Sequence, residues 1–302
     1  MGTLHIQGAL LKLQMARRGV GRREFAMYRK MLGHSMTFKL QRRILPGLVW
    51  NQEVYGQRIF ECLEHGQRWL DFGCGKRLLA GGLEQLESEL ARTPFVGLDL
   101  SLENLRAQQH TRRCVLADGN YLPFKNESFD LITSNMVVEH LKEPVLAFAE
   151  LNRVLAPGGT ILLHTPNLAN YLVFTNRLVS AVLPRRVHAA LVGTSEMRTE
   201  TDIYPTFYRA NTRGTLRKLA SSIGEVTLEF LPGPRPFFHH FAPVAAIELL
   251  MTRLSQTAPF RRFGTTLLVS IRKPGAARGQ AIPVLETSAQ DGLAGPARGS
   301  AA

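Results

Sequence analysis

Between residues 68 and 168, short apolar runs alternate with amphipathic stretches. The apolar runs are four to six residues long, which is typical of buried strands, and the amphipathic stretches predict helices between them. Strands are expected within 68–75, 95–100, 114–117, 129–134 and 160–165, and helices at 78–90, 102–110 and about 144–155. Strands that alternate with helices form a mostly parallel sheet that is covered on both faces.

Outside this block the pattern changes. Residues 5–65 predict helices rich in basic side chains, while 168–209 and 232–263 show no clean alternation and predict two irregular insertions. A helix at about 212–222 and strands at 225–231 and 265–271 complete the pattern. Gly, Ala, Pro and Ser dominate from residue 274 onward, which predicts a disordered tail. We therefore expect a helical extension at 1–67, the main domain at 68–273 and the tail at 274–302.

Composition is that of an ordinary globular protein, with 45% hydrophobic and 20% charged residues in 302. No run of 18 uncharged apolar residues predicts a membrane span, and the N-terminus does not follow the pattern of a secretory signal. The cysteines Cys62, Cys74 and Cys114 lack metal-ligand spacing and are too few for a disulfide framework. A cytoplasmic location is expected.

The net charge of +13 is concentrated in the flanks. Residues 1–68 and 168–302 each carry an excess of eight positive charges, whereas 69–167 carry a slight negative excess. Basic flanks suggest an acidic partner, either a phosphorylated substrate, an anionic membrane or a nucleic acid, although an Arg-rich solvated surface accounts for them equally well.

Acidic and glycine residues gather where the predicted strands end. Asp71, Gly73 and Gly75 follow the first strand, Asp99 ends the second, and Asp118 with Gly119 ends the third. Ligands bind at the carboxyl ends of parallel strands, where a carboxylate can hold a ribose diol and glycine lets the backbone approach a ligand closely. A nicotinamide site would need glycine at Leu78, so the turn does not match that motif.

Four segments together resemble the class I S-adenosylmethionine-dependent methyltransferases, especially those that methylate small molecules and isoprenoid quinones. They are WLDFGCGKR (69–77), FVGLDLS (95–101), ADGNYLPFKNESFDLI (117–132) and LAPGGTILLHTPN (155–167). The resemblance is strong over 68–168 and weaker over 212–271. It implies a Rossmann-like, doubly wound α/β fold with a mostly parallel seven-stranded sheet, a helical N-terminal extension and cap insertions.

The same resemblance implies a binding site for S-adenosylmethionine. Its implied contacts are Asp71, Gly73, Cys74, Gly75, Asp99, Leu100, Asp118, Gly119 and Asn135. The glycines would lie against the methionine part, with Asp71 supporting their turn. Asp99 would bind the ribose hydroxyls, and Leu100 and Asp118 would contact the adenine. Asn135 would lie near the sulfonium.

One position departs from the family pattern. Arg77 stands where the family often has a third glycine, which leaves open how tightly the turn closes. We expect a lower affinity for the cofactor on this ground.

Two residues are candidates for catalysis, His140 and Tyr171. His140 could act as a general base or be a packed or surface histidine. Some relatives hold a divalent cation with Glu-x-x-Glu-His here, but Met136 replaces the first glutamate, so no metal is expected.

Tyr171, Tyr204 and Tyr208 flank the first insertion, where aromatic faces could attract the sulfonium or simply pack. Tyr204, Tyr208 and Arg209 are candidates for the acceptor pocket.

The apolar piece at 237–254, with Arg253, Arg261 and Arg262 at or after its end, allows three interpretations. It could lie on an anionic membrane, line a pocket for a lipid-like acceptor, or pack as a lid.

The function that the sequence predicts is methyl transfer to a small-molecule or lipid-like acceptor by in-line displacement. An RNA methyltransferase and a non-catalytic cofactor-binding module stay as alternatives, although no nucleic-acid-binding motif is recognised. The sequence does not indicate the oligomeric state.

Overall fold

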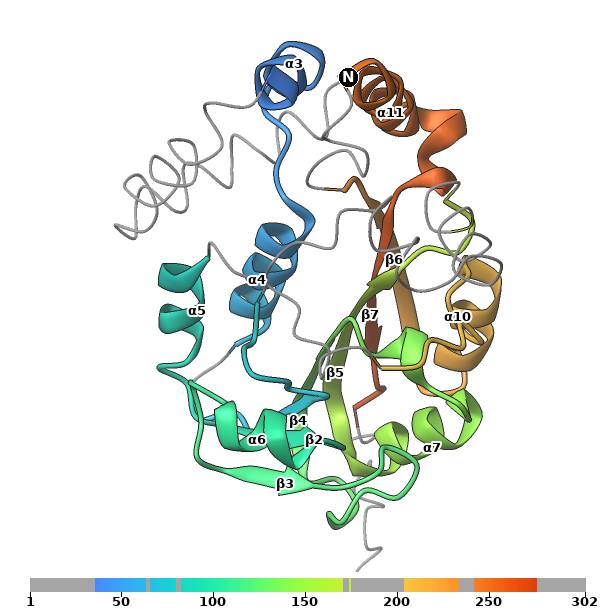
Figure 1. The fold of residues 1–302 in the computed structure, drawn as a ribbon. Helices are drawn as coiled ribbons and strands as arrows, with labels where there is room; N and C mark the ends of the chain where they lie inside the picture. The colour runs from blue at the N-terminus through green and yellow to red at the C-terminus, as the bar shows by residue number, and fades with distance from the viewer. Residues whose placement is uncertain are drawn as a thin grey trace, which may run out of the picture.

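A single seven-stranded sheet organises the protein, which a computed structural model describes at residues 36–63, 66–79, 83–170, 174, 204–233 and 242–275. The strand order is β3-β2-β1-β4-β5-β7-β6 (Figure 1). The strands are β1 Trp69–Phe72, β2 Phe95–Asp99, β3 Cys114–Leu116, β4 Phe129–Asn135, β5 Leu155–Pro166, β6 Glu225–Leu231 and β7 Thr266–Arg272. β1 to β5 pair in parallel, and β7 pairs antiparallel with both β5 and β6. This confirms the expected doubly wound, mostly parallel sheet.

Helices lie on both faces of the sheet and beyond one of its ends (Figure 1). They are α3 Met36–Ile44, α4 Asn51–Cys62, α5 Glu84–Leu90, α6 Leu102–Ala107, α7 Pro144–Val154, α10 Arg213–Ala220 and α11 Ala242–Ser255, with 3-10 helices η1 Val138–His140 and η3 Ala258–Phe263. Ser101 caps α6 as expected, because its hydroxyl accepts a hydrogen bond from Asn104 N at 3.2 Å.

Alternating side chains of the strands build one apolar layer on each face. On β5, Ile161 and Leu163 belong to the cluster that also contains residues of α7 and α10. Leu162, between them, belongs to the second cluster, with residues of α4 and α5. Because successive strand residues point to opposite faces, a continuous apolar run covers both sides of the sheet. The continuous runs in the sequence correctly predicted this burial.

Several predicted boundaries differ from the structure. α5 begins at Glu84 instead of Leu78, since Leu78 and Leu79 pack into the core before the helix starts. β5 begins at Leu155, directly after α7, and the segment Pro157-Gly158-Gly159 expected as a turn lies within it. The pairing of β5 with β4 shifts register there, between Phe129 and Leu131. This irregularity accommodates the two glycines inside the strand.

The prediction of an irregular piece at 232–263 is wrong for most of its length. α11 and η3 occupy 242–255 and 258–263, and α11 lies beside α3 in Figure 1. Leu, Ile, Met and Ala fill α11 and favour a helix, but the aromatic and proline residues before it obscured this signal. No helix among the described residues is long and apolar enough to cross a bilayer.

The helical expectation for 5–65 holds for the part that is described. α3 and α4 are separated by residues 45–50, which contain Pro46 and Gly47, and the φ of 82° at Gly47 favours glycine in this turn. The domain limits at 67/68 and 273/274 stay predictions, while residues 171–173 and 175–203 of the first insertion and residues 276–302 of the tail lie outside the described part of the chain.

Candidate functional site

The glycine turn after β1 is closed on one side and open on the other. Gly73 and Gly75 have φ values of 72° and 52°, which favour glycine. The backbone N–H groups of Gly73 and Cys74 both donate to Leu98 O, at 2.7 and 2.9 Å, so the turn is fastened to β2. A Cβ on Gly73 would lie 2.4 Å from Val137, whereas a Cβ on Gly75 would meet nothing within 4 Å. The open side at Gly75 leaves room for a ligand.

Asp99 lies at the end of β2 with its carboxylate already oriented. Its Oδ2 accepts from Gly75 N at 2.9 Å and its Oδ1 from Ser101 N at 2.8 Å. A carboxylate has about four lone-pair sites, so both oxygens can still accept from the two hydroxyls of a ribose. Leu100, next in the chain, is 67% exposed, and its apolar side chain can cover an adenine face. The residues present therefore fit the nucleoside part of S-adenosylmethionine.

Asp118 and Gly119 form the corresponding turn after β3. Asp118 Oδ1 accepts from Asn120 N at 2.9 Å, and the side chain remains exposed. A Cβ on Gly119 would lie 2.4 Å from the ring of Phe72, so glycine lets this loop close over the end of β1. β3, β2 and β1 are neighbours in the sheet. The structure therefore brings the glycine turn, Asp99 and Asp118 together at the carboxyl ends of these strands.

Asp71 lies deeper than the turn that it was expected to support. It is buried inside β1, and its Oδ1 accepts from the Thr133 hydroxyl of β4 at 2.7 Å. Burial raises the pKa of this carboxyl to about 7, and the negative charges of Asp99 and Glu87 add to the shift. The structure therefore shows Asp71 as part of the β1–β4 pairing beneath the site.

Arg77 does not fill the glycine turn. Its guanidinium points to α5, where Nε and Nη2 donate to Glu87 Oε2 at 2.9 and 2.6 Å. The Glu87 carboxylate is fully buried, and its other oxygen accepts from Leu79 N at 3.2 Å. The missing third glycine is thus compatible with a closed turn, since the arginine side chain leaves it and pairs with a buried acid.

Asn135 belongs to a buried polar network that the sequence did not predict. Its Nδ2 donates to Gln52 Oε1 at 2.8 Å and to Leu78 O at 3.0 Å, and its Oδ1 lies 2.9 Å from His164 Nδ1. Since the amide oxygen can only accept, His164 Nδ1 carries the proton, and its Nε2 accepts from the Thr266 hydroxyl at 3.0 Å. Burial lowers the pKa of His164 to about 3, so it stays neutral.

Through this network, α4 contributes directly to the site. Gln52 comes from the N-terminal extension, and Tyr55 of the same helix stacks on His164 with 5.3 Å between ring centroids. The only hint in the sequence is a pair of amides, Asn51 and Gln52, at the start of an otherwise amphipathic stretch. Such a pair normally predicts a helix cap and not a contact 83 residues away.

The described end of the predicted cap, from Tyr204 onward, contacts both α6 and η1. The Tyr204 hydroxyl accepts from Asn104 Nδ2 at 3.1 Å, and Asn104 Nδ2 also lies 3.5 Å from Asp99 Oδ1. On its other side, the Tyr204 ring meets the His140 ring edge to face, with 5.9 Å between centroids. His140 Nδ1 lies 2.9 Å from Pro205 O and therefore donates to it. Tyr204 thus connects the ribose side of the site with His140.

Glu139 holds the rest of this segment in place. Its backbone oxygen accepts from Phe207 N and Tyr208 N at 2.8 and 3.1 Å. Its buried carboxylate accepts from Thr165 at 3.0 Å. Arg209 Nη1 donates to Lys142 O at 2.7 Å and lies 3.4 Å from Glu143 Oε1. In the sequence, Glu139 stands at the second glutamate of the Glu-x-x-Glu-His pattern for which no metal was expected, whereas the structure shows it as a support of the cap.

Tyr171 lies outside the described residues, so its role stays a prediction. Among the residues that the structure describes, no three His, Cys, Asp or Glu side chains gather closely enough to hold a metal ion.

Comparison with known proteins finds a methyltransferase domain in this chain. Residues 70–163 match a family described as "Methyltransferase domain". A malonyl-[acyl-carrier protein] O-methyltransferase of Erwinia billingiae is 40% identical over 119 residues, covering 38% of this chain and 45% of that protein. A ubiquinone biosynthesis O-methyltransferase of Paracidovorax citrulli is 30% identical over 150 residues, covering 44% of this chain and 60% of that protein. The chain thus spans less than two thirds of these relatives.

A solved structure from Archaeoglobus fulgidus, described as a SAM-dependent methyltransferase, aligns with 82% of this chain and 99% of its own. The TM-score is 0.47 at 13% identity. The family match shows a methyltransferase domain at residues 70–163, and the strand order has the Rossmann-like arrangement expected of class I S-adenosylmethionine-dependent methyltransferases.

Proposed function

We propose that the protein transfers a methyl group from S-adenosylmethionine to a small-molecule or lipid-like acceptor by in-line displacement. The observation that carries this proposal is the Asp99 carboxylate, fixed by Gly75 N–H beside the open side of the glycine turn. A buried carboxylate with two oriented oxygens suits a ribose diol, and the space at Gly75 suits the chain that follows it.

The residues proposed to hold the cofactor are those that the resemblance to class I methyltransferases implies. Asp99 would bind the ribose, Leu100 and Asp118 the adenine, and Gly73, Cys74 and Gly75 the methionine part, with Asn135 close to the sulfonium. When bound, the cofactor supplies a methyl group made electrophilic by the sulfonium. The protein has to align a nucleophile behind that methyl group and exclude water.

His140 is proposed as the group that accepts a proton from the acceptor. Its Nδ1 donates to Pro205 O, so in the neutral ring Nε2 is the proton-accepting atom. Glu139 Oε1 lies 4.0 Å from Nε2 and would stabilise the imidazolium once it forms. The hydrogen bond to Pro205 also fixes the ring plane, which favours a defined direction of proton transfer.

The acceptor would lie under the segment that begins at Tyr204. Tyr204 and Tyr208 would contact the acceptor there, with Arg209 at its edge and Tyr171 as a further candidate. The relatives are named as O-methyltransferases that act on malonyl-[acyl-carrier protein] or in ubiquinone biosynthesis, which supports an oxygen nucleophile on a partly apolar acceptor.

The test is a transfer assay with S-adenosylmethionine labelled on its methyl group. Phenolic metabolites, a bacterial lipid extract and RNA serve as separate acceptors, and Gly75→Ala serves as the cofactor-site control. Label in a metabolite or lipid fraction that is lost in the control supports the proposal. Label in RNA alone, or cofactor binding without transfer to any acceptor, contradicts it.

A further inference from the structure

α11 carries an apolar stripe on its outer face. Ile247, Leu250, Met251 and Leu254 follow the i, i+3, i+4, i+7 spacing of one helix face and are 61%, 54%, 42% and 40% exposed. The opposite face is buried through Ala245, Glu248 and Leu249. A helix of a globular protein normally turns its apolar stripe inward, so this one indicates a contact with something outside the fold.

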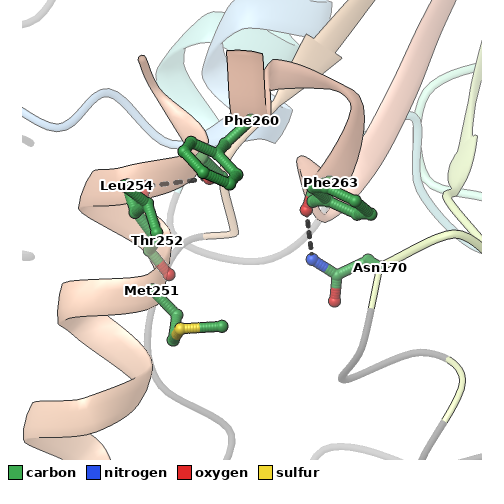
Figure 2. Close-up of a pocket in the computed structure, with 7 residues that line it drawn as sticks. Asn170, Met251, Thr252, Leu254, Phe260 and Phe263 are labelled. Carbon is green, nitrogen blue, oxygen red and sulfur yellow. Dashed lines mark hydrogen bonds between the residues drawn. The ribbon is translucent and has the colours of Figure 1, made fainter. Parts of the chain in front are cut away.

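η3 extends the stripe into an apolar hollow next to α11 (Figure 2). The hollow has a volume of about 250 Å³. It is lined by Asn170, Met251, Thr252, Leu254, Ser255, Phe260 and Phe263. Asn170 Nδ2 is turned to Phe263 O, to which it donates at 2.5 Å, and this leaves a mostly hydrocarbon wall. The shape and chemistry suit part of an acyl chain.

Positive charge surrounds the stripe and the hollow. Arg253, Arg261 and Arg262 are exposed, and no described residue forms an ion pair with them. Glu248 is the one acidic residue between 242 and 263, and it is only 3% exposed. An apolar face with basic residues at its border, and no exposed acid among them, is complementary to an anionic lipid surface.

The position of this surface relates it to the methyl-transfer site. Asn167, just after β5, donates from Nδ2 to Arg262 O at 3.0 Å and to Gly264 O at 2.8 Å. η3 is therefore hydrogen-bonded to the segment that follows the carboxyl end of β5. Asn135 and Asp99 lie at the same edge of the sheet. A bilayer against α11 and η3 would face this edge.

We propose that the face formed by Ile247, Leu250, Met251, Leu254 and Phe260, with its three arginines, docks on an anionic lipid bilayer. The apolar side chains enter the interfacial region, the arginines contact lipid phosphates, and the hollow takes part of an acyl chain. This docking does not depend on methyl transfer, so it can be tested without an acceptor.

The experiment is co-sedimentation of the full chain with vesicles of phosphatidylcholine, with and without phosphatidylglycerol. Two double variants remove either half of the surface, Leu250→Gln/Leu254→Gln and Arg261→Gln/Arg262→Gln. The charge-matched control is Arg112→Gln/Arg113→Gln, an exposed pair just before β3 and thus at the opposite end of the sheet. Circular dichroism confirms that each variant is folded.

The expected result is binding to the anionic vesicles that each test variant weakens by about tenfold or more, while the control pair weakens it much less. Three results would overturn the proposal. They are equal binding to neutral vesicles, test variants that bind like the control, and a lipid-free dimer that Leu250→Gln/Leu254→Gln dissociates, because the face would then belong to a second copy of the chain.

Discussion

Gly75 N donates a hydrogen bond of 2.9 Å to Asp99 Oδ2, which joins the turn after β1 to the carboxylate that ends β2. The two residues are 24 positions apart, and each lies where a parallel strand stops. One bond therefore couples the shape of the glycine turn to the direction of the carboxylate. A change in either residue should alter both halves of the cofactor site.

The two glycines of this turn should respond differently to a methyl group. Gly75→Ala should lose about 1–2 kcal/mol of stability because of its positive φ, and should weaken binding of S-adenosylhomocysteine because the Cβ enters the open side of the turn. Gly73→Ala adds a clash with Val137 and should be less stable than Gly75→Ala. Thermal unfolding measures the stability of both variants, and calorimetric titration measures their affinity for S-adenosylhomocysteine. Unchanged affinity in a folded Gly75→Ala protein would contradict the proposed ligand position.

Arg77 should matter for stability and not for cofactor contact. Arg77→Ala leaves the Glu87 carboxylate buried without its cation, which should cost about 2–4 kcal/mol after allowance for the part of the arginine that is exposed. Denaturant unfolding checks this value. Arg77→Leu combined with Glu87→Leu should recover much of the loss, because it removes the buried charge together with its partner. A single variant as stable as the wild type would refute this role.

Asp71 should make the protein less stable at high pH. Its pKa is raised to about 7 in the folded state, above the ordinary value of 3.8, so the folded protein binds one more proton than the unfolded chain between these values. The contribution of Asp71 to the free energy of unfolding is fully present below about pH 4 and is lost as the pH rises toward 7. Urea unfolding from pH 5 to 8 should show a decline that Asp71→Asn reduces. An identical pH dependence in both proteins would count against the raised pKa.

His140→Gln tests the proposed base once an acceptor is found. The loss of proton transfer should lower kcat about 100-fold while binding of S-adenosylhomocysteine stays the same. His110→Gln is the matched control, since that ring lies beside Glu87, away from the cap. Initial rates and titrations separate the two effects. An unchanged kcat would mean that His140 only packs against Tyr204 and Pro205.

The central sheet could be predicted because local and global signals agree there. β6 was predicted with its observed bounds, and the cap of α6 by Ser101 needs only a serine before an amphipathic run. Asp99 and Asp118 could be found because parallel strands place their carboxyl ends at one edge. These features depend on a few neighbouring residues and on one topological rule.

The remaining features depend on contacts between distant parts of the chain. Gln52 reaches Asn135 only after α4 packs on the sheet, and Arg77 finds Glu87 only once α5 has formed. α11 was missed because the aromatic and proline residues before it obscured the helical signal of its Leu, Ile, Met and Ala residues. Burial and pairing decide such positions, and neither is visible in a single sequence.

The most direct test of the cofactor site is calorimetric titration of S-adenosylhomocysteine into the wild type, Asp99→Asn and Asp130→Asn. Asp130 is a carboxylate at the opposite end of the sheet, paired with Arg68 at 2.6 Å, and serves as the matched control. We predict binding to the wild type and the control, and at least about tenfold weaker binding to Asp99→Asn. Equal affinity of all three, or no binding to the folded wild type, would contradict the account.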